Sequence, residues 1–285
     1  MTQDQSESRR STRIHSMEED TFDQSQPRIG RRESEPHSFE VSYIHDVLCN
    51  NFPNHHTLWD LHHYFLINGE EYDIQFDISF FLNLKIPYTL SSYRATEHNH
   101  QIPQMAINIL SKSTWKTDLS ENIDMCRIIG IPIYIIFAPF DVATKTYKPP
   151  FIRVYFLQKD RAYINKELRN TCFKPDGSLI VENLIDFDGM LPFKIGLKEL
   201  EQKHDGGRTL YRMVFFDQNS SQLFLTKLEQ EKKRADQEKS RADQEKIRAD
   251  QEKIRADQEK IRADQEKAKA DNMKRFLKDK GIQFE

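Results

Sequence analysis

The chain contains 285 residues, of which 37% are hydrophobic and 31% charged, and its formal net charge is −3. This near-neutral balance lacks the basic excess of proteins that bind a phosphate backbone, so composition weighs mildly against a nucleic-acid partner. Three cysteines without a CxxC pair argue against both a disulfide framework and a thiolate zinc site.

The N-terminal segment, residues 1–37, is polar and charged and contains a single aromatic residue, Phe22. Such a segment buries too little apolar surface to offset the entropy that the chain would lose on folding. We therefore expect a disordered tail, followed by a globular domain over residues 38–225.

The longest apolar stretch, Ile128–Phe140, is too short to cross a bilayer as a helix. A secretory signal consists of a basic segment followed by an apolar run, and the first residues do not show this pattern. We expect a soluble, intracellular protein with no membrane partner.

The clearest local signal lies in residues 71–82, where apolar side chains alternate with polar ones from Tyr72 to Leu82. Asp73 and Asp77 both fall on the polar side of this alternation. A period of two residues predicts a strand with one apolar face and one face that carries carboxylates.

Further segments of the same domain follow in chain order. Their composition predicts a strand over 104–111, a helix over 112–129, a strand over 131–139, and strands over 151–158 and 162–168 that form a hairpin. This order of elements indicates an α/β core built on a mixed sheet.

The C-terminal segment, residues 226–285, repeats a heptad of the form RADQEK plus one residue five times from Arg234 onward. Thr226 and Glu229 have the spacing of a capping box, which predicts that a helix begins there and runs to about residue 280. At about 1.5 Å per residue, such a helix would be about 80 Å long.

Self-association of this helix is an open question at the level of the sequence. Ile247, Ile254 and Ile261 occupy one heptad position, but the other core position of the heptad is Asp or Gln, which weakens a coiled coil. Ion pairs three and four residues apart would instead support a solvated single helix by about 0.2 to 0.5 kcal/mol per pair. We expect an isolated or loosely associated helix, with a defined oligomer as the alternative.

Four segments carry a resemblance to a known family: QFDISFF, INILSKSTWKTDLSENIDMC, GIPIYIIFAP and DGMLPFKIGL. In order and spacing they resemble the Uma family, a group of restriction-endonuclease-like proteins of the PD-(D/E)XK nuclease superfamily that is common in cyanobacteria. The resemblance covers roughly residues 40–285. It implies a restriction-endonuclease-like mixed β-sheet flanked by helices, with a Mg²⁺-dependent site that cleaves DNA.

The chemistry of that family needs two carboxylates on neighbouring strands to hold divalent ions, and a lysine to orient the attacking water. By the resemblance, Asp77 matches the family's aspartate and is the remnant catalytic residue and weak metal ligand. Asn108 stands at the glutamate position and Asn122 at the lysine position. Because each asparagine removes a charge, the resemblance implies a catalytically impaired site.

We therefore expect a pseudoenzyme that acts as a binding or interaction module, with DNA as the partner that the family implies. Asn108 would mark a former metal-ligand position that faces a cleft, with solvent or Asp77 as its partner. Asp118 would be an acid near the start of a helix, stabilised by the helix dipole.

Two alternatives remain. An active Mg²⁺-dependent DNA endonuclease would need a relocated catalytic partner, for which Glu121, Lys112 and Lys116 are the candidates. A helical scaffold protein would use the globular domain only to anchor the long C-terminal helix.

Overall fold

The computed structural model describes residues 35–86, 88–111, 114–139, 148–204 and 207–279. Most of the tail that we expect to be disordered, residues 1–34, lies outside the described residues. Residues 35–37, which we assigned to the same tail, belong to the folded domain, because helix α2 spans Glu35–Asn51 and buries His37. Within the described residues, the folded domain therefore already includes residues 35–37.

A seven-stranded mixed sheet forms the centre of the domain. Its strand order is β3-β1-β2-β4-β5-β6-β7, in which the β1–β3 and β4–β5 pairs are parallel and the other pairs antiparallel. The strands span Tyr93–Arg94 (β3), His56–Ile67 (β1), Glu70–Phe81 (β2), Met105–Ile109 (β4), Ile133–Ala138 (β5), Phe151–Leu157 (β6) and Tyr163–Leu168 (β7). The mixed α/β sheet that the sequence predicts is confirmed.

A second, three-stranded sheet follows the first along the chain. It consists of β8 (Leu184–Ile185), β9 (Phe193–His204) and β10 (Arg208–Asp217), in the order β10-β9-β8. The sequence analysis did not anticipate this sheet, nor β1 or α2. Short 3-10 helices, Ala95–Glu97 and Val181–Asn183, complete the connections.

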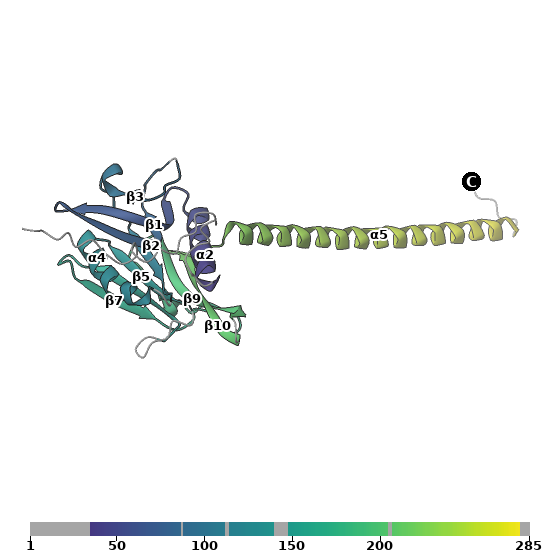
Figure 1. The fold of residues 1–285 in the computed structure, drawn as a ribbon. Helices are drawn as coiled ribbons and strands as arrows, with labels where there is room; N and C mark the ends of the chain where they lie inside the picture. Colours follow the sequence, from purple (N-terminus) through teal and green to yellow (C-terminus); the bar gives the residue numbers. More distant parts are fainter. Residues whose placement is uncertain (1–34, 87, 112–113, 140–147, 205–206, 280–285) are drawn as a thin grey trace, which may run out of the picture.

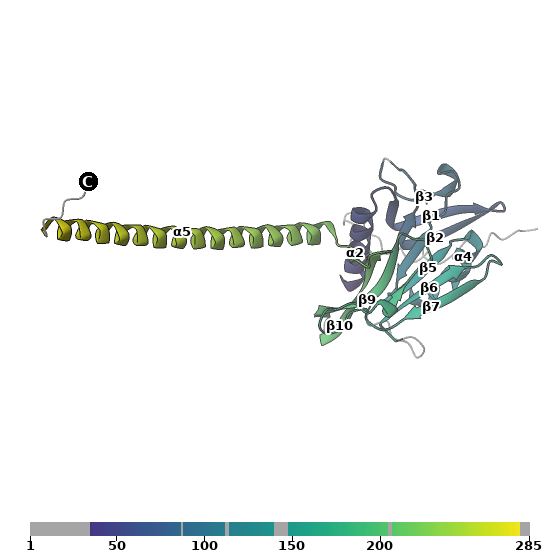
Figure 2. The ribbon, with the colours of Figure 1, turned by 180° about the vertical axis from the view of Figure 1, so that it is seen from behind.

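Both faces of the large sheet are covered (Figures 1 and 2). On one face, α2 and the small sheet pack against β2, β4, β5 and β6 in a core that includes Ile44, Val47 and Phe193. On the other face, Cys126 and Ile129 of helix α4 join a second core with residues of β1, β2 and β5. The strands buried on both faces, such as β5, therefore read as continuous apolar runs in the sequence.

The helix expected over 112–129 is two helices in the structure, α3 (Trp115–Asp118) and α4 (Glu121–Ile129). Ser120 causes the break, because its backbone leaves the helical region at φ −140° and ψ −83° and its hydroxyl donates to the carbonyl of Lys116. Helix α4 ends at Gly130, whose φ of 92° suits a residue without a side chain. The break places Asp118 and Asn122 on either side of a tight corner.

Helix α5 spans Lys227–Asp279 and projects from the domain as a single rod (Figure 1). Its capping box is confirmed, since the Thr226 amide donates to Glu229 at 2.8 Å and the Glu229 amide donates to the Thr226 hydroxyl at 3.2 Å. Asn50 and Asn51 of α2 donate to the carbonyl of Leu225 and hold the start of the rod against the domain. No residue of α5 is buried.

Within the part of the chain that the structure describes, no helix combines the length and the apolar character that a membrane span requires.

Candidate functional site

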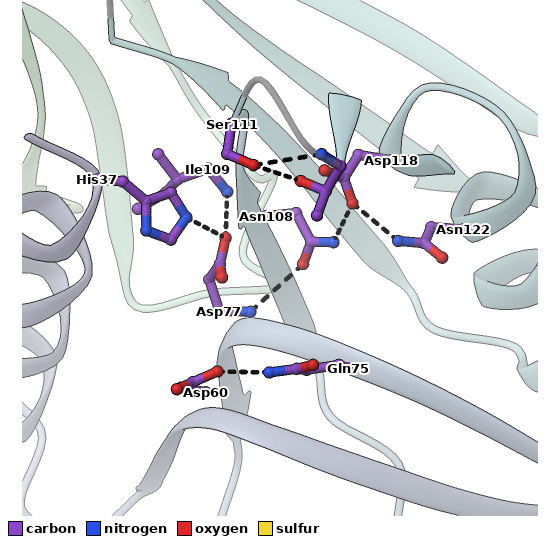
Figure 3. A network of polar contacts seen from close by, with 10 residues as sticks. His37, Asp60, Gln75, Asp77, Asn108, Ile109, Ser111, Asp118 and Asn122 are labelled. Carbon is purple, nitrogen blue, oxygen red and sulfur yellow. Dashed lines mark hydrogen bonds and ion pairs between the residues drawn. The ribbon is translucent and has the colours of Figure 1, made fainter. Parts of the chain in front are cut away.

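Asp77 and Asn108 lie where strands β2 and β4 stop pairing. The antiparallel ladder between these strands ends at the pair Ile78 and Ile107, so Asp77 and Asn108 would form the next pair. At this point the two strands are joined by bonds from backbone amides to side chains, in place of the bonds between backbone groups (Figure 3). The Asp77 amide donates to Asn108 Oδ1 at 3.4 Å, and the Ile109 amide donates to Asp77 Oδ2 at 2.6 Å.

The orientation of the Asn108 amide follows from its two partners. The backbone N–H of Asp77 can only donate, so the atom that faces it must be the oxygen Oδ1. The nitrogen Nδ2 therefore faces Asp118 and donates to its Oδ1 at 2.7 Å. Asn108 is 5% exposed, and these two bonds supply the partners that a buried amide requires.

Asp118 is the centre of the buried network. As the last residue of α3 it accepts from Asn108 and, through the same oxygen, from Asn122 Nδ2 at 2.9 Å. Asp118 is 3% exposed and Asn122 is also buried. Asp118 lies in the first turn of α3, as expected of an acid near a helix start, and it is in addition a buried acceptor that joins β4, α3 and α4.

Burial raises the pKa of the Asp118 carboxyl from 3.8 to about 6. Hydrogen bonds from Thr114, Asn108 and Asn122 act in the opposite direction, and the negative charge of Asp77 adds to the rise. Desolvation outweighs the hydrogen bonds because none of these partners carries a positive charge.

His37 joins the site from helix α2, which packs over strands β2 and β4 in the middle of the large sheet. Its Nε2 lies 3.2 Å from Asp77 Oδ2, and the imidazole is buried. Because the carboxylate can only accept, the Nε2 atom carries the proton of this bond. Sequence reasoning missed His37 because it stands among polar residues, and its burial depends on contacts with residues 40 positions away.

Ser111 and Thr114, which lie between β4 and α3, contact each other. The Ser111 hydroxyl lies 2.9 Å from the Thr114 hydroxyl and accepts from the Thr114 amide at 3.3 Å. Thr114 precedes α3, and Asp118 at the end of that helix lies beside Asn108 (Figure 3).

Of the three candidates for a relocated catalytic partner, two are exposed and one lies outside the described residues. Glu121 is exposed in the first turn of α4. Lys116 is exposed, and its Nζ lies over the ring of Trp115 at 5.5 Å from the centroid. Lys112 lies outside the described residues.

The residues at this site do not fit a Mg²⁺ ion in the arrangement that the structure shows. Mg²⁺ prefers ionised carboxylates and water in octahedral geometry. Here Asn108 turns an N–H donor toward Asp118, and the same Asp118 oxygen also accepts from Asn122. Asp77 directs one carboxylate oxygen to His37 and the Ile109 amide. The Asn108 position is also buried, in contrast to the open cleft that we expected.

Comparisons with known proteins are sparse. No family model and no curated protein matches the chain. A crystal structure from Anabaena variabilis ATCC 29413, described as "a putative nuclease belonging to DUF820", is similar at 20% sequence identity and a TM-score of 0.36. The similarity covers 50% of this chain and 73% of that one.

Proposed function

We propose that residues 35–225 form a restriction-endonuclease-like domain whose catalytic site has become a structural hydrogen-bond network. The domain then acts as a binding module, with DNA as the first ligand to test. The support is the order of the motif residues along the chain, together with their meeting at the end of the β2–β4 ladder.

The observation that carries this proposal is that the Asn108 side chain makes two hydrogen bonds, one to the Asp77 amide and one to the Asp118 carboxyl. A glutamate at this position would present two acceptors, one of which would face Asp118 across a buried gap now bridged at 2.7 Å. Two carboxylates at that distance repel each other unless a cation or a proton separates them. The N–H donor of asparagine takes the place of the cation, so the buried site needs no metal ion to balance a second carboxylate.

The same reasoning applies to Asn122 at the lysine position. Its Nδ2 donates to Asp118 over 2.9 Å, so a neutral donor stands where the family pattern places an ammonium group. The network therefore keeps the hydrogen bonds of a catalytic site but loses the charges that would bind a metal ion and orient water.

An active Mg²⁺-dependent endonuclease is the second candidate, favoured by one observation. Asp77 and Asp118 come from different elements and both contact the side chain of Asn108, Asp77 through its backbone amide and Asp118 through its carboxyl. In this function Asp118 would be the relocated carboxylate, in place of Glu121.

Incubation of the purified protein with plasmid DNA and either Mg²⁺ or Mn²⁺ separates the two functions. We expect no cleavage by the wild-type protein and retention of DNA on a gel-shift assay without added metal. Cleavage that disappears in Asp77→Ala and Asp118→Asn, but persists in the exposed control Asp73→Ala, would overturn the proposal and establish the endonuclease.

A gain-of-function variant provides a second readout. Asn108→Glu combined with Asn122→Lys returns the full set of charges, and circular dichroism verifies that the variant still folds. A binding module that has lost catalysis gives cleavage only in this variant, whereas an active enzyme cleaves before the substitution and more strongly after it.

A further inference from the structure

Helix α5 presents an exposed apolar stripe that the domain does not cover. Ile247, Ile254 and Ile261 are 57%, 57% and 56% exposed. They recur every seven residues along a helix that runs without interruption from Lys227 to Asp279. A seven-residue repeat drifts around a straight helix by about 20° per heptad, so it stays on one line only when helices supercoil about each other.

The neighbouring residues determine the heptad position of the isoleucines. If they occupied position a, position d would be Asp250 and Asp257, and a seam would bury carboxylates without partners. If they occupy position d, position a is Gln244, Gln251 and Gln258, whose amides can donate to and accept from their counterparts on a second helix. The isoleucines therefore belong at d.

With this assignment, the residues that flank the seam carry opposite charges. Position g is aspartate at residues 243, 250 and 257, and position e is arginine at residues 248, 255 and 262. In a parallel pair, each g residue faces the e residue five positions later on the other helix, so every such contact joins Asp to Arg. In an antiparallel pair, g faces g and e faces e, and every contact joins like charges.

We propose that α5 pairs with α5 of a second copy of this chain, parallel and in register, with the three isoleucines facing each other along the seam. The complementary flanks select this partner and this direction, because an antiparallel copy loses the Asp to Arg contacts. A parallel copy shifted by one heptad keeps those contacts but loses one of the three Ile contacts, which favours the unshifted register. The seam is short, so the association is weak.

The position of the seam along the rod leaves room for two domains at the same end. The d residues nearest the domain are Lys233 and Ser240, which are polar, so the apolar seam begins only at Ile247. That residue lies 20 positions beyond Lys227, or about 30 Å along the helix at about 1.5 Å per residue. The pair would display two copies of the sheet domain at the same end. When one domain holds a ligand, the effective concentration of the second domain near that ligand is raised.

Sedimentation of the full chain, from micromolar to hundreds of micromolar, tests the association. We expect a shift from monomer to dimer across this range, and a dissociation constant at least about tenfold higher for the triple variant Ile247→Ala, Ile254→Ala, Ile261→Ala. Alanine preserves helix propensity, so loss of pairing cannot arise from loss of the helix. The matched control, Glu245→Gln, Glu252→Gln, Glu259→Gln, changes residues outside the seam and should dimerise like the wild type.

Direction and register have their own test. Ser240→Cys in a Cys49→Ser background places a thiol at position d. In a parallel, in-register pair, this thiol faces the same thiol of the second copy. We expect a disulfide-linked dimer under mild oxidation, and none for Ala249→Cys on the outer face. A wild-type protein that remains monomeric at hundreds of micromolar, or a dimer in which Ser240→Cys does not cross-link, would overturn the proposal.

Discussion

Asn108 Nδ2 lies 2.7 Å from Asp118 Oδ1, and this contact joins the central strand β4 to the corner between α3 and α4. The amide oxygen of the same side chain accepts from the Asp77 backbone, so one asparagine links three segments of the chain. The residue that interrupts an apolar strand is thus a cross-link between elements. Its removal should therefore affect stability.

Replacement of Asn108 by alanine should lower the free energy of unfolding by about 2 to 4 kcal/mol, because it leaves the Asp77 amide and the Asp118 carboxyl buried without this partner. Urea denaturation of the full chain measures the change. Asn165→Ala on the exposed face of β7 is the matched control and should change stability little. Equal midpoints for the two variants would contradict the cross-linking role.

Asp118 should make stability depend on pH between about 4 and 6. Its carboxyl has a raised pKa of about 6 in the folded chain, against 3.8 ordinarily, so the fold favours the protonated form. The stabilisation is complete below the unfolded value and is lost as the pH rises through the folded value, by about 2 to 3 kcal/mol in total.

Asp118→Asn isolates this effect, because it keeps an oxygen that accepts from Asn108 and Asn122 but carries no charge. The difference in unfolding free energy between variant and wild type should grow in favour of the variant from pH 4 to pH 7. Burial also raises the pKa of Glu40, to about 7, but this group is the same in both proteins. A difference that stays constant with pH would show that Asp118 titrates normally.

His37 should contribute to stability although it precedes the domain boundary expected from the sequence. Its imidazole is buried and pairs with Asp77 at 3.2 Å, so His37→Ala should cost about 1 to 3 kcal/mol in thermal or urea unfolding. Ser38→Ala, at the adjacent exposed position of α2, should cost much less. If both substitutions are equally mild, the contact between α2 and strand β2 does not stabilise the fold.

A peptide of residues 226–280 should be strongly helical in circular dichroism at low micromolar concentration, before any pairing of helices. Its capping box and its ion pairs three and four residues apart act along the whole length. Molar salt should reduce the ellipticity because it screens the ion pairs. A random-coil spectrum at low concentration would mean that the helix depends on the domain or on a second helix.

Local patterns in the sequence determined a substantial part of this structure. The alternation around Asp77 predicts β2. The β6–β7 hairpin follows from two predicted strands separated by the polar residues 159–161, and the capping box at Thr226 marks the start of α5. Each of these signals arises from contacts between residues close in the chain, so periodicity and capping chemistry suffice to identify them.

The buried network was decided by tertiary structure alone. The motif order indicated that Asp77, Asn108 and Asn122 belong together, but it could not assign Asp118 as their shared acceptor or bring His37 to the same carboxylate. The role of a polar side chain depends on whether it is desolvated and which partner it meets when strands and helices far apart in sequence pack together. The small sheet formed by β8, β9 and β10 is a further example, since its core residues pack with those of α2, more than a hundred positions away in the chain, and with those of the large sheet. Local propensity carries no information about such contacts, because their free energy comes from burial that exists only in the assembled fold.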